Sequence, residues 1–600
     1  MRKRFVLISI LLPLVSLLLF WHTFSCSVQA KPPMIDVGGS ITSDTTWTFA
    51  NSPYILTDTV TIEAGVTLTV EAGVTIMVPD MGEYLDVQGH LEAVGTAVNP
   101  ILFTSIDDLA SNNWSGIAVS GSANFAHATL RHAYTALFIS GSIGGDVSLA
   151  DSVVEENLVY PIVVNTDALH RLKMDNVTFS NNVPNRVGIE TASGNLALAG
   201  SPTLEPQPGL EGYEELNTDI PTVFTVPEGI TLTLEPGTNL MMLSTVQVAG
   251  HVAANGTATD PVIWQAVPES AGGVFSVIVL PAGTVAFNQT TLKGSPTLGL
   301  AVVGESDRPI IIQNSTLEDM GDYPMLIVPP SLHRVEMNNL TFSNNAFNRV
   351  LVDTEGGQDA IVADVKLTAQ PGLEWYEFAD GSSSQTPPAQ FVVPEGITLT
   401  VEPGVELRFG DGAEEFVVNG SLFTRGSLAQ PVTLTSGSNA TAGDWLGLII
   451  NGEVDLVNTA VRFGNHNLTI NNTADALLEN VTLTQAEFAG LRVVGGMVTA
   501  VRSQFAQNGT DGILVENNGA PAVSISSSGI SSNGSTGLRN LSGTLVEAEG
   551  NWWGDASGPS GDGSGSGDGV EGDVNFSSWL TDELWTMLHY ELYLPSIILP

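Results

Sequence analysis

The chain has 600 residues, 43% of them hydrophobic, and its 64 Asp and Glu outnumber 19 Lys and Arg to give a formal net charge of -45. Such a charge repels phosphate backbones, which argues against nucleic acid as a partner. A single cysteine excludes a disulfide framework and a cysteine-based zinc or iron–sulfur site. Because only 14% of residues are charged, the composition is typical of a folded protein rather than of an acidic disordered chain.

The first thirty residues have the pattern of a signal peptide. A basic start at 2–4 precedes an apolar run over 5–24, and Val28-Gln-Ala30 supplies small or short residues at the -3 and -1 positions of a cleavage site. We therefore predict cleavage after Ala30 and an exported protein without a later membrane span. Two alternatives stay open: an uncleaved N-terminal anchor, since the run is about long enough to cross a bilayer, and a lipoprotein attached through Cys26.

Three copies of one long unit follow the signal peptide. Each opens with the pattern Gly-[Val/Ile]-Thr-Leu-Thr-[Val/Leu]-Glu-x-Gly, and the equivalent last glycines are Gly73, Gly237 and Gly404. The first two copies also share a second half that begins at His170 and at His333, and the third copy departs there. Duplication of a whole module explains this self-similarity.

Short strands dominate each unit. In the first opening, Val66, Leu68 and Val70 alternate with two threonines, and no stretch of the chain keeps a helical period for long. Asparagine pairs are expected to end strands with residues that tolerate left-handed turns; they lie at 181–182, 344–345, 471–472 and 517–518.

The strand pattern predicts an all-β fold. Alternation alone also suits a two-layer sandwich, which therefore stays an alternative. Bends that carry one Gly or Asn, instead of two-residue hairpins, favour a solenoid in which short parallel strands stack coil upon coil.

At these residues the chain resembles exported bacterial right-handed parallel β-helix proteins of the pectin-lyase-like fold. The resemblance rests on the three openings, on a Gly-[Ser/Thr]-x3-Pro strand in each unit, and on Trp-x-Gly coils at Trp114 and Trp445, where the middle unit has Phe275. The most specific match is 551–580, which resembles the block that closes many such helices. The resemblance implies a fold more than an activity, because this fold hosts lyases, hydrolases, adhesins and inert surface proteins.

The closing block is expected to cover the exposed strand edges and apolar interior of the last coil, with Trp552, Trp553 and Trp579 as the plug. The whole fold is thus expected to be a right-handed parallel β-helix built from three tandem modules. The predicted parts are a signal peptide (1–30), module 1 (38–200), module 2 (201–367), module 3 (368–550), the closing block (551–580) and an apolar tail (581–600).

The sequence does not contain the full motif sets of the polysaccharide-degrading enzymes that share this fold. Polygalacturonase-like enzymes carry NTD, DD, GHG and RIK-type motifs in that order. Here Asn165-Thr-Asp167 is followed closely by Arg171-Leu-Lys173, Asp107-Asp108 lies upstream, and Gly-His-Gly does not occur. No dense acidic cluster with a neighbouring Arg suggests a calcium-dependent lyase. We therefore assign no catalytic, cofactor-binding or metal-binding residue.

Several charged residues are interpreted as structural. The pairs Glu155-Glu156 and Glu214-Glu215 are read as solvated turns, since adjacent strand residues face opposite sides. His90 and its equivalent His251 are expected to point outward from strands. The repeated His-Arg pairs are expected at coil corners; they are 170–171 and 333–334.

Two segments near the C-terminus leave alternatives open. The loop 562–573 carries four acidic residues in a Gly-Ser-rich backbone, and it is either an ordinary loop of the closing block, which we favour, or a calcium site. The tail from Leu584 is either a sorting or envelope-docking tag or a strand packed on the rod.

The sequence favours a protein secreted from, or displayed on, a bacterial cell, with a structural, adhesive or glycan-contacting role and no catalysis. Duplication repeats a surface, as binding or reach requires, whereas an enzyme needs one cleft. The competing hypothesis is a polysaccharide lyase or glycoside hydrolase with an unrecognised cleft. The expected partners are extracellular polysaccharide or cell-envelope components, and no cofactor is expected.

Overall fold

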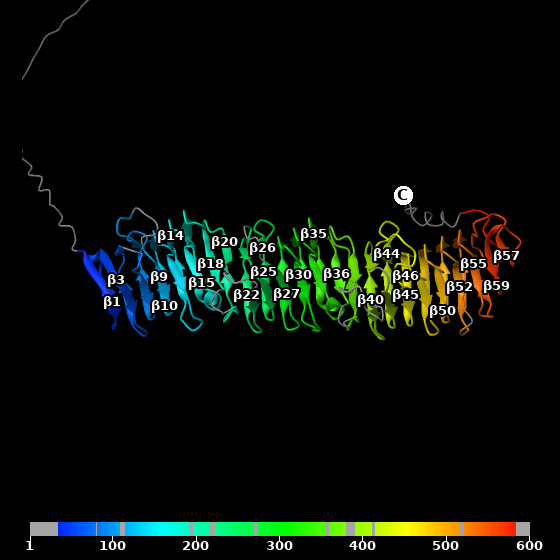
Figure 1. Ribbon diagram of the computed structural model, residues 1–600, viewed down its shortest axis with the longest axis horizontal. Coiled ribbons are helices and arrows are strands. Elements are labelled where there is room, and N and C mark those ends of the chain that lie inside the picture. Colours follow the sequence, from blue (N-terminus) through cyan, green and yellow to red (C-terminus); the bar gives the residue numbers. More distant parts are fainter. Residues whose placement is uncertain are drawn as a thin grey trace, which may run out of the picture.

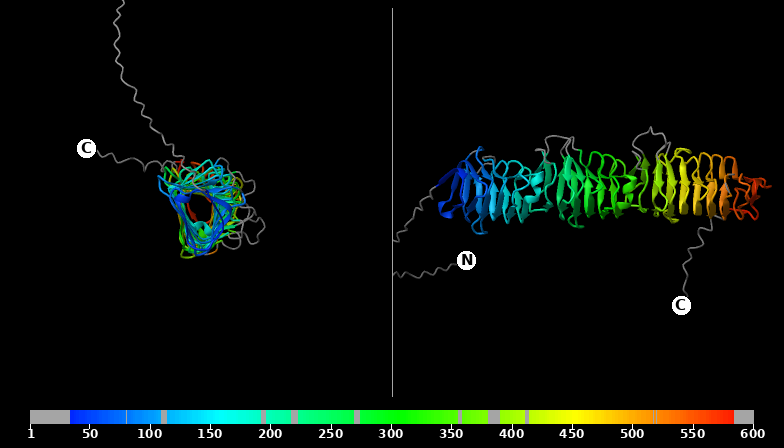
Figure 2. Two further views of the ribbon diagram at one scale, coloured as in Figure 1. Left: turned by 90° about the vertical axis from the view of Figure 1, so that its left-hand side faces the viewer. Right: turned by 90° about the horizontal axis from the view of Figure 1, so that it is seen from below.

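The computed structural model shows one elongated column of stacked coils (Figure 1). Seen end-on, the column is roughly triangular, and each coil contributes strands to three faces (Figure 2). The predicted signal peptide and the tail from residue 584 onward lie outside the described residues. The structure describes residues 34–79, 81–108, 114–191, 196–216, 223–268, 274–354, 359–379, 390–410, 414–516, 518 and 520–583.

The strands of each face follow one another along the column. The first face contains β2 (Thr45–Trp47), β4 (Thr67–Val70), β7 (His90–Val94), β10 (Ser122–Ala126), β13 (Val147–Ala150), β16 (Leu172–Asp175), β19 (Thr203–Leu204), β22 (Thr231–Leu234), β25 (His251–Asn255), β28 (Thr284–Asn288), β31 (Ile310–Gln313), β34 (Val335–Asn338), β37 (Val365–Leu367), β40 (Thr398–Val401), β43 (Ser421–Arg425), β46 (Glu453–Arg462), β48 (Asp475–Thr484), β50 (Met497–Val501), β53 (Ala522–Ser526), β56 (Val546–Glu547) and β59 (Val574–Asn575).

The second face also receives the far ends of the long strands β46 and β48 and the first half of β1 (Ile35–Ile41), while the second half of β3 pairs on the third face. Its own strands are β3 (Tyr54–Ile62), β5 (Thr75–Val78), β8 (Ile101–Ser105), β11 (Ala128–Arg131), β14 (Val153–Glu155), β17 (Thr178–Ser180), β20 (Gly212–Leu216), β23 (Asn239–Met242), β26 (Val262–Ala266), β29 (Thr290–Lys293), β32 (Thr316–Glu318), β35 (Thr341–Ser343), β38 (Tyr376–Ala379), β41 (Glu406–Phe409), β44 (Val432–Ser436), β51 (Gln504–Ala506) and β54 (Gly529–Ser531).

The third face completes each coil. It contains β1 (Ile35–Ile41), β6 (Leu85–Val87), β9 (Ile117–Val119), β12 (Leu137–Ile139), β15 (Ile162–Asn165), β18 (Arg186–Glu190), β21 (Val223–Val226), β24 (Thr245–Val248), β27 (Ser276–Val279), β30 (Leu300–Val302), β33 (Met325–Ile327), β36 (Val350–Asp353), β39 (Gln390–Val393), β42 (Glu415–Val418), β45 (Gly447–Ile450), β47 (Leu468–Ile470), β49 (Leu491–Val493), β52 (Asp511–Val515), β55 (Thr536–Asn540), β57 (Pro559–Gly561) and β58 (Gly567–Glu571). Three short 3-10 helices are η1 (Phe49–Asn51), η2 (Thr166–Arg171) and η3 (Pro329–Arg334).

Strand pairs among the described residues run parallel, each strand bonding to a strand of the next coil. His90 on β7 faces Ser122 on β10, and the later coils repeat this arrangement. The predicted parallel solenoid is therefore confirmed, and the two-layer sandwich is wrong.

The core is one apolar column that runs from Trp47 to Val574. It follows from alternation: Leu68 and Val70 point inward and are buried, whereas the threonines between and before them stay half exposed. Each fully buried Val or Leu contributes about 1.5–3 kcal/mol relative to exposure. No single coil could bury its own inward row, so stacking supplies the stability.

Bends between faces use left-handed backbone. Asn181 has φ 54° and Asn344 has φ 55°, which confirms the role predicted for these two asparagine pairs. The pair 471–472 also ends a strand, β47 (Leu468–Ile470), although neither residue is left-handed, and residue 517 lies outside the described part of the chain.

The hydrogen-bonded ladder of the first face breaks twice. It ends at β16 and restarts at β19, and it ends again at β34 and restarts at β37. Hydrogen bonding between strands continues across each break, from the third face to the second. At the first break β18 pairs with β20, and at the second β36 pairs with β38. The breaks lie where the sequence repeats meet; the division into three modules stays a prediction that they support.

The last coils contain the predicted plug. Trp553 is fully buried and belongs to the core, Trp579 is partly buried against it, and Trp552 is buried but is not part of that cluster.

Within the described residues no helix combines the length and apolar character needed to cross a membrane.

Candidate functional site

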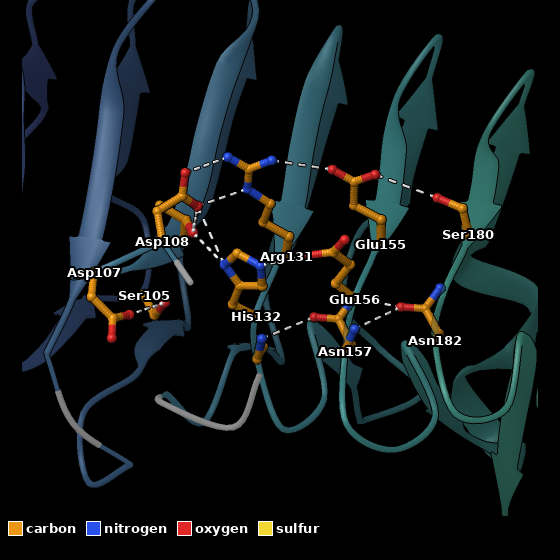
Figure 3. A network of polar contacts seen from close by, with 12 residues as sticks. Ser105, Asp107, Asp108, Arg131, His132, Glu155, Glu156, Asn157, Ser180 and Asn182 are labelled. Atoms are coloured by element: carbon orange, nitrogen blue, oxygen red, sulfur yellow. Dashed lines mark hydrogen bonds and ion pairs between the residues drawn. The ribbon is translucent and has the colours of Figure 1, made fainter. Parts of the chain in front are cut away.

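A row of charged side chains crosses successive coils at the corner between the second and third faces (Figure 3). Asp108 follows β8, Arg131 ends β11 and Glu155 ends β14, so parallel stacking places them side by side. The Arg131 Nε atom donates to Asp108 Oδ1 at 2.8 Å, and its NH1 group donates to Glu155 Oε1 at 3.3 Å. One guanidinium thus links the carboxylates of the coils before and after it.

His132 forms a second link in the same row. Its Nε2 atom lies 2.7 Å from Glu156 Oε2, and its Nδ1 atom lies 3.1 Å from Thr104 Oγ1 and 3.3 Å from Asp108 Oδ1. The side chain is almost fully buried and has left-handed backbone, φ 58°. Glu155 and Glu156 are therefore not free solvated turn residues, which corrects the interpretation made from the sequence.

The electrostatics of the row favour the charged forms. Burial alone would raise the pKa of the Asp108 carboxyl, but hydrogen bonds from Thr104 and Arg131, with the Arg131 charge, lower that pKa below its usual value. Burial would lower the pKa of Arg131, and Asp108 and Glu155 together raise it. The ion pairs between Arg131 and the two carboxylates join neighbouring coils. Because these groups stay charged, they are poorly suited to proton transfer.

Behind this row, Asn157 and Asn182 form an internal amide ladder (Figure 3). The Asn157 side chain donates to Asn182 Oδ1 at 2.8 Å and accepts from the backbone N–H of Ala133 at 3.0 Å. These amides satisfy backbone groups where the strands bend.

Arg171 and Arg334 lie buried at coil corners, as the sequence predicted for the His-Arg pairs. The Arg171 guanidinium donates to backbone carbonyls of the turns beneath it, including Gly141 O at 2.7 Å and Gly145 O at 2.9 Å. Arg334 does the same with Arg308 O at 2.8 Å. Burial lowers the pKa of both arginines. They act as clamps on turns rather than as a surface ridge.

The pair Glu214-Glu215 lies at the first break of the ladder. Glu214 Oε2 accepts from Arg186 NH1 at 2.9 Å. Glu215 is fully buried, and its carboxylate accepts from the backbone N–H groups of Leu243 at 2.8 Å and Ser244 at 2.9 Å. The two side chains do face opposite sides, but the interpretation as a solvated turn is wrong, because Glu215 caps a buried bend.

The second break carries an equivalent ion pair and an added ring stack. Arg349 NH1 donates to Glu377 Oε2 at 2.9 Å, as Arg186 does at the first break. Glu377 also accepts from the Tyr323 hydroxyl at 3.0 Å, and burial with the adjacent Glu377 charge raises the pKa of Tyr323 to about 12. Trp375 lies within this cluster, with the Arg349 guanidinium 4.0 Å from its ring centre.

A cavity of about 410 Å³ lies at the first break, between β16 and β19. Leu172, Met174, Leu204 and Tyr213 contribute apolar surface, and Lys173 also lines the cavity. The Tyr213 hydroxyl donates to Glu205 O at 2.8 Å, so the one polar group of this tyrosine already has a hydrogen-bond partner within the protein.

The loop 562–573 does not gather its carboxylates. Asp568 accepts from the backbone N–H groups of Ser532 and Asn533, both at 2.9 Å, and Asp562 accepts from Gly572 N–H at 2.8 Å. Within the described residues no group of three or more His, Cys, Asp or Glu is placed to hold a metal ion. The geometry therefore favours a closing loop, with Asp568 capping the last coils.

His90 and His251 occupy equivalent outward positions on the first face, as predicted. His251 Nδ1 lies 2.6 Å from Thr284 Oγ1, and His90 Nδ1 lies 2.8 Å from Ser122 Oγ. His90 also contacts Glu92, at 3.0 Å from Nε2. Sequence reasoning missed this grouping, because Ser122 is 32 residues away and becomes a neighbour only once the coil length is known.

Comparison with known proteins agrees with this architecture. Residues 39–150 match the family model described as a pectate-lyase like β-helix domain. Searches of curated proteins and of solved structures find no match. The matched segment reaches from β2 to β13, and the later coils continue it in the same parallel manner. The described part of the chain is therefore a parallel β-helix, and its residues 39–150 are similar to the pectate-lyase like β-helix domain.

Proposed function

We propose that the protein is an exported bacterial β-helix protein that contacts extracellular polysaccharide and does not cleave glycosidic bonds. One observation carries the proposal: the carboxylates of the Asp108 to Glu156 row each contact an Arg or His of a neighbouring coil. Glycoside hydrolysis needs an acid and a base placed across a scissile bond, about 5–10 Å apart. Carboxylates engaged in holding coils together do not meet that need.

Two further features support a scaffold with a long contact surface. The family model that matches 39–150 is named after pectate lyase, which connects the fold with polysaccharides. The coils extend without interruption of the core from Trp47 to Val574, which presents long parallel faces. Export rests on the signal-peptide pattern, and N-terminal sequencing of the secreted protein should begin at Lys31.

The test separates contact from cleavage. Protein cut after residue 30 would be incubated with insoluble and soluble polysaccharides, and we would measure cosedimentation, new reducing ends and unsaturated uronate. We expect cosedimentation with at least one polysaccharide and no product. Product formation that a single carboxylate substitution abolishes would overturn the proposal.

A second candidate, a polysaccharide lyase or hydrolase, is favoured by a cluster on the third face near the C-terminal end. Asp511 is buried and lies 3.3 Å from Arg539 NH2, and Arg492 Nε donates to Glu516 Oε1 at 2.8 Å. Burial and the Arg492 charge lower the pKa of the nearby His466. If this cluster were catalytic, Asp511→Asn would abolish product formation in the same assay.

A further inference from the structure

We propose that Ser122, His90 and Glu92 act as nucleophile, base and carboxylate in the hydrolysis of carboxylic esters. This activity goes beyond the proposed polysaccharide contact, and it leaves glycosidic bonds intact.

Strand register brings the three residues together. β7 and β10 are parallel neighbours in which His90 pairs with Ser122 and Glu92 pairs with Asn124. Since side chains alternate along a strand, all four point to the same outer surface. The His90 side chain is 37% exposed and that of Glu92 is 36% exposed, so a ligand in solvent can reach them.

The hydrogen bonds fix the tautomer of His90. Glu92 Oε2 lies 3.0 Å from Nε2, and an ionised carboxylate only accepts, so Nε2 carries the proton. In the neutral ring Nδ1 is then the acceptor, and it lies 2.8 Å from Ser122 Oγ. With this tautomer the Ser122 hydroxyl donates to the unprotonated Nδ1, which is the relation that activates a serine nucleophile.

Neighbouring groups hold the arrangement in place. Asn124 Nδ2 donates to Glu92 Oε1 at 3.0 Å, which orients the carboxylate. Arg171 donates to the carbonyl of Gly121, directly before Ser122, and so fixes the bend that presents the serine. A Cβ at Gly145, in the next coil, would lie 2.9 Å from Ser122 Cβ. Glycine at 145 thus keeps the space beside the serine open.

The equivalent positions of the other repeats provide an internal comparison. In the second, His251 contacts Thr284 at 2.6 Å, but Ala253 stands where Glu92 stands in the first. In the third, Ser421 replaces the histidine and pairs with Glu453. Among these three sets, only the first combines a hydroxyl, an imidazole and a carboxylate.

The reaction follows from these positions. Ser122 Oγ attacks the ester carbonyl carbon while its proton moves to His90 Nδ1, and Glu92 stabilises the resulting imidazolium. Collapse of the tetrahedral intermediate breaks the bond to the alcohol oxygen, which leaves with the proton from His90. Water then attacks the acyl-serine, again giving its proton to His90, and the serine departs with that proton. The net change is one ester and one water to one acid and one alcohol.

The surroundings indicate the class of ester. The side chains of His90 and Glu92 are more than a third exposed on a strand face, which suits an acyl group carried on an extended polymer. The formal net charge of -45 disfavours substrates with free carboxylates and favours uncharged esters.

The test uses p-nitrophenyl acetate and a fluorophosphonate probe on the mature protein. We expect multiple turnovers, labelling of the peptide that contains Ser122, and loss of at least 100-fold in rate in Ser122→Ala and His90→Asn. Thr284→Ala is the matched control, since it removes a hydroxyl from a histidine contact that lacks a carboxylate, and it should retain the full rate.

Glu92 is a positioning residue and needs its own readout. Glu92→Gln should lower the rate and also shift the pH profile, because it removes the charge beside the imidazolium. Circular dichroism melting of each variant excludes unfolding as the cause. Absence of turnover and labelling in the wild type, or an unchanged rate in a folded Ser122→Ala variant, would overturn the proposal, and neither result bears on polysaccharide cosedimentation.

Discussion

The guanidinium carbon of Arg408 lies 3.4 Å from the centre of the Trp375 ring. Arg349, from the coil on the other side, lies 4.0 Å from the same ring, so the indole links three successive coils. At the first break the equivalent positions hold Gly212 and Met241, which form no such stack. The two breaks of the first-face ladder therefore have equivalent strand pairing. They differ in the side-chain contacts between coils, because only the second has the stack on Trp375.

Trp375→Gly places at the second break the residue found at the equivalent position of the first, Gly212. It removes two cation–π contacts of about 0.5–1 kcal/mol each at a partly exposed position. Hydrogen exchange followed by mass spectrometry should show faster exchange in β38 and unchanged exchange in β20. Equal protection of β38 in variant and wild type would contradict the role of the stack.

Arg171→Leu should strongly destabilise the coils around β16. The variant leaves several turn carbonyls without their donor, and each unsatisfied buried group costs about 1–3 kcal/mol. We expect a clear drop in the melting temperature measured by circular dichroism. The control is Arg308→Ala, at an exposed ion pair with Glu228 worth about 0–1 kcal/mol. Similar shifts in both variants would argue against the clamp.

Asp108 should make the coils around β8 and β11 sensitive to acid. Its pKa is lower in the folded protein than in the unfolded chain, where the pKa of an aspartate is about 3.9. The ionised form therefore stabilises the fold fully above about pH 4–5, and that contribution is lost as the pH falls through the folded pKa.

Melting temperatures at pH 7 and pH 3.5 check this expectation. Asp108→Asn should lower the value at pH 7 and reduce the difference between the two pH values. A wild-type difference that the substitution leaves unchanged would mean that other carboxylates dominate the acid response.

Asp568→Ala should destabilise the C-terminal coils with or without calcium. Asp568 caps backbone N–H groups of the 532–533 bend, and hydrogen bonds to a charged group contribute about 1.5–3 kcal/mol. The melting temperature should fall equally in calcium and in chelator. A rise in calcium for the wild type, absent in the variant, would instead establish the calcium alternative for 562–573.

Local patterns were sufficient to predict the architecture. Alternation such as Leu68 and Val70 against their threonines defines an inward row, and the repeated openings show that the row recurs. These features depend on neighbours in sequence, so the parallel column could be expected before any coordinates.

Contacts between coils could not be predicted in the same way. Arg131 meets Glu155, and Ser122 meets His90, only because particular coils have particular lengths. The pattern of one strand does not encode the number of residues in the bend before the next. Glu215 shows the same limit: its sequence neighbours suggest a surface turn, and its partners lie one coil further on.

The two interruptions of the first-face ladder bear on how the column would yield to mechanical force. Pulling on its ends would separate the coils one after another. Loss of strand hydrogen bonds would pass easily from coil to coil along an unbroken hydrogen-bonded row. At β16 and at β34 that row stops, so separation must begin again in the next segment. A molecule stretched between two anchors is therefore expected to pause near these two places, where the β18–β20 and β36–β38 pairs still join the coils.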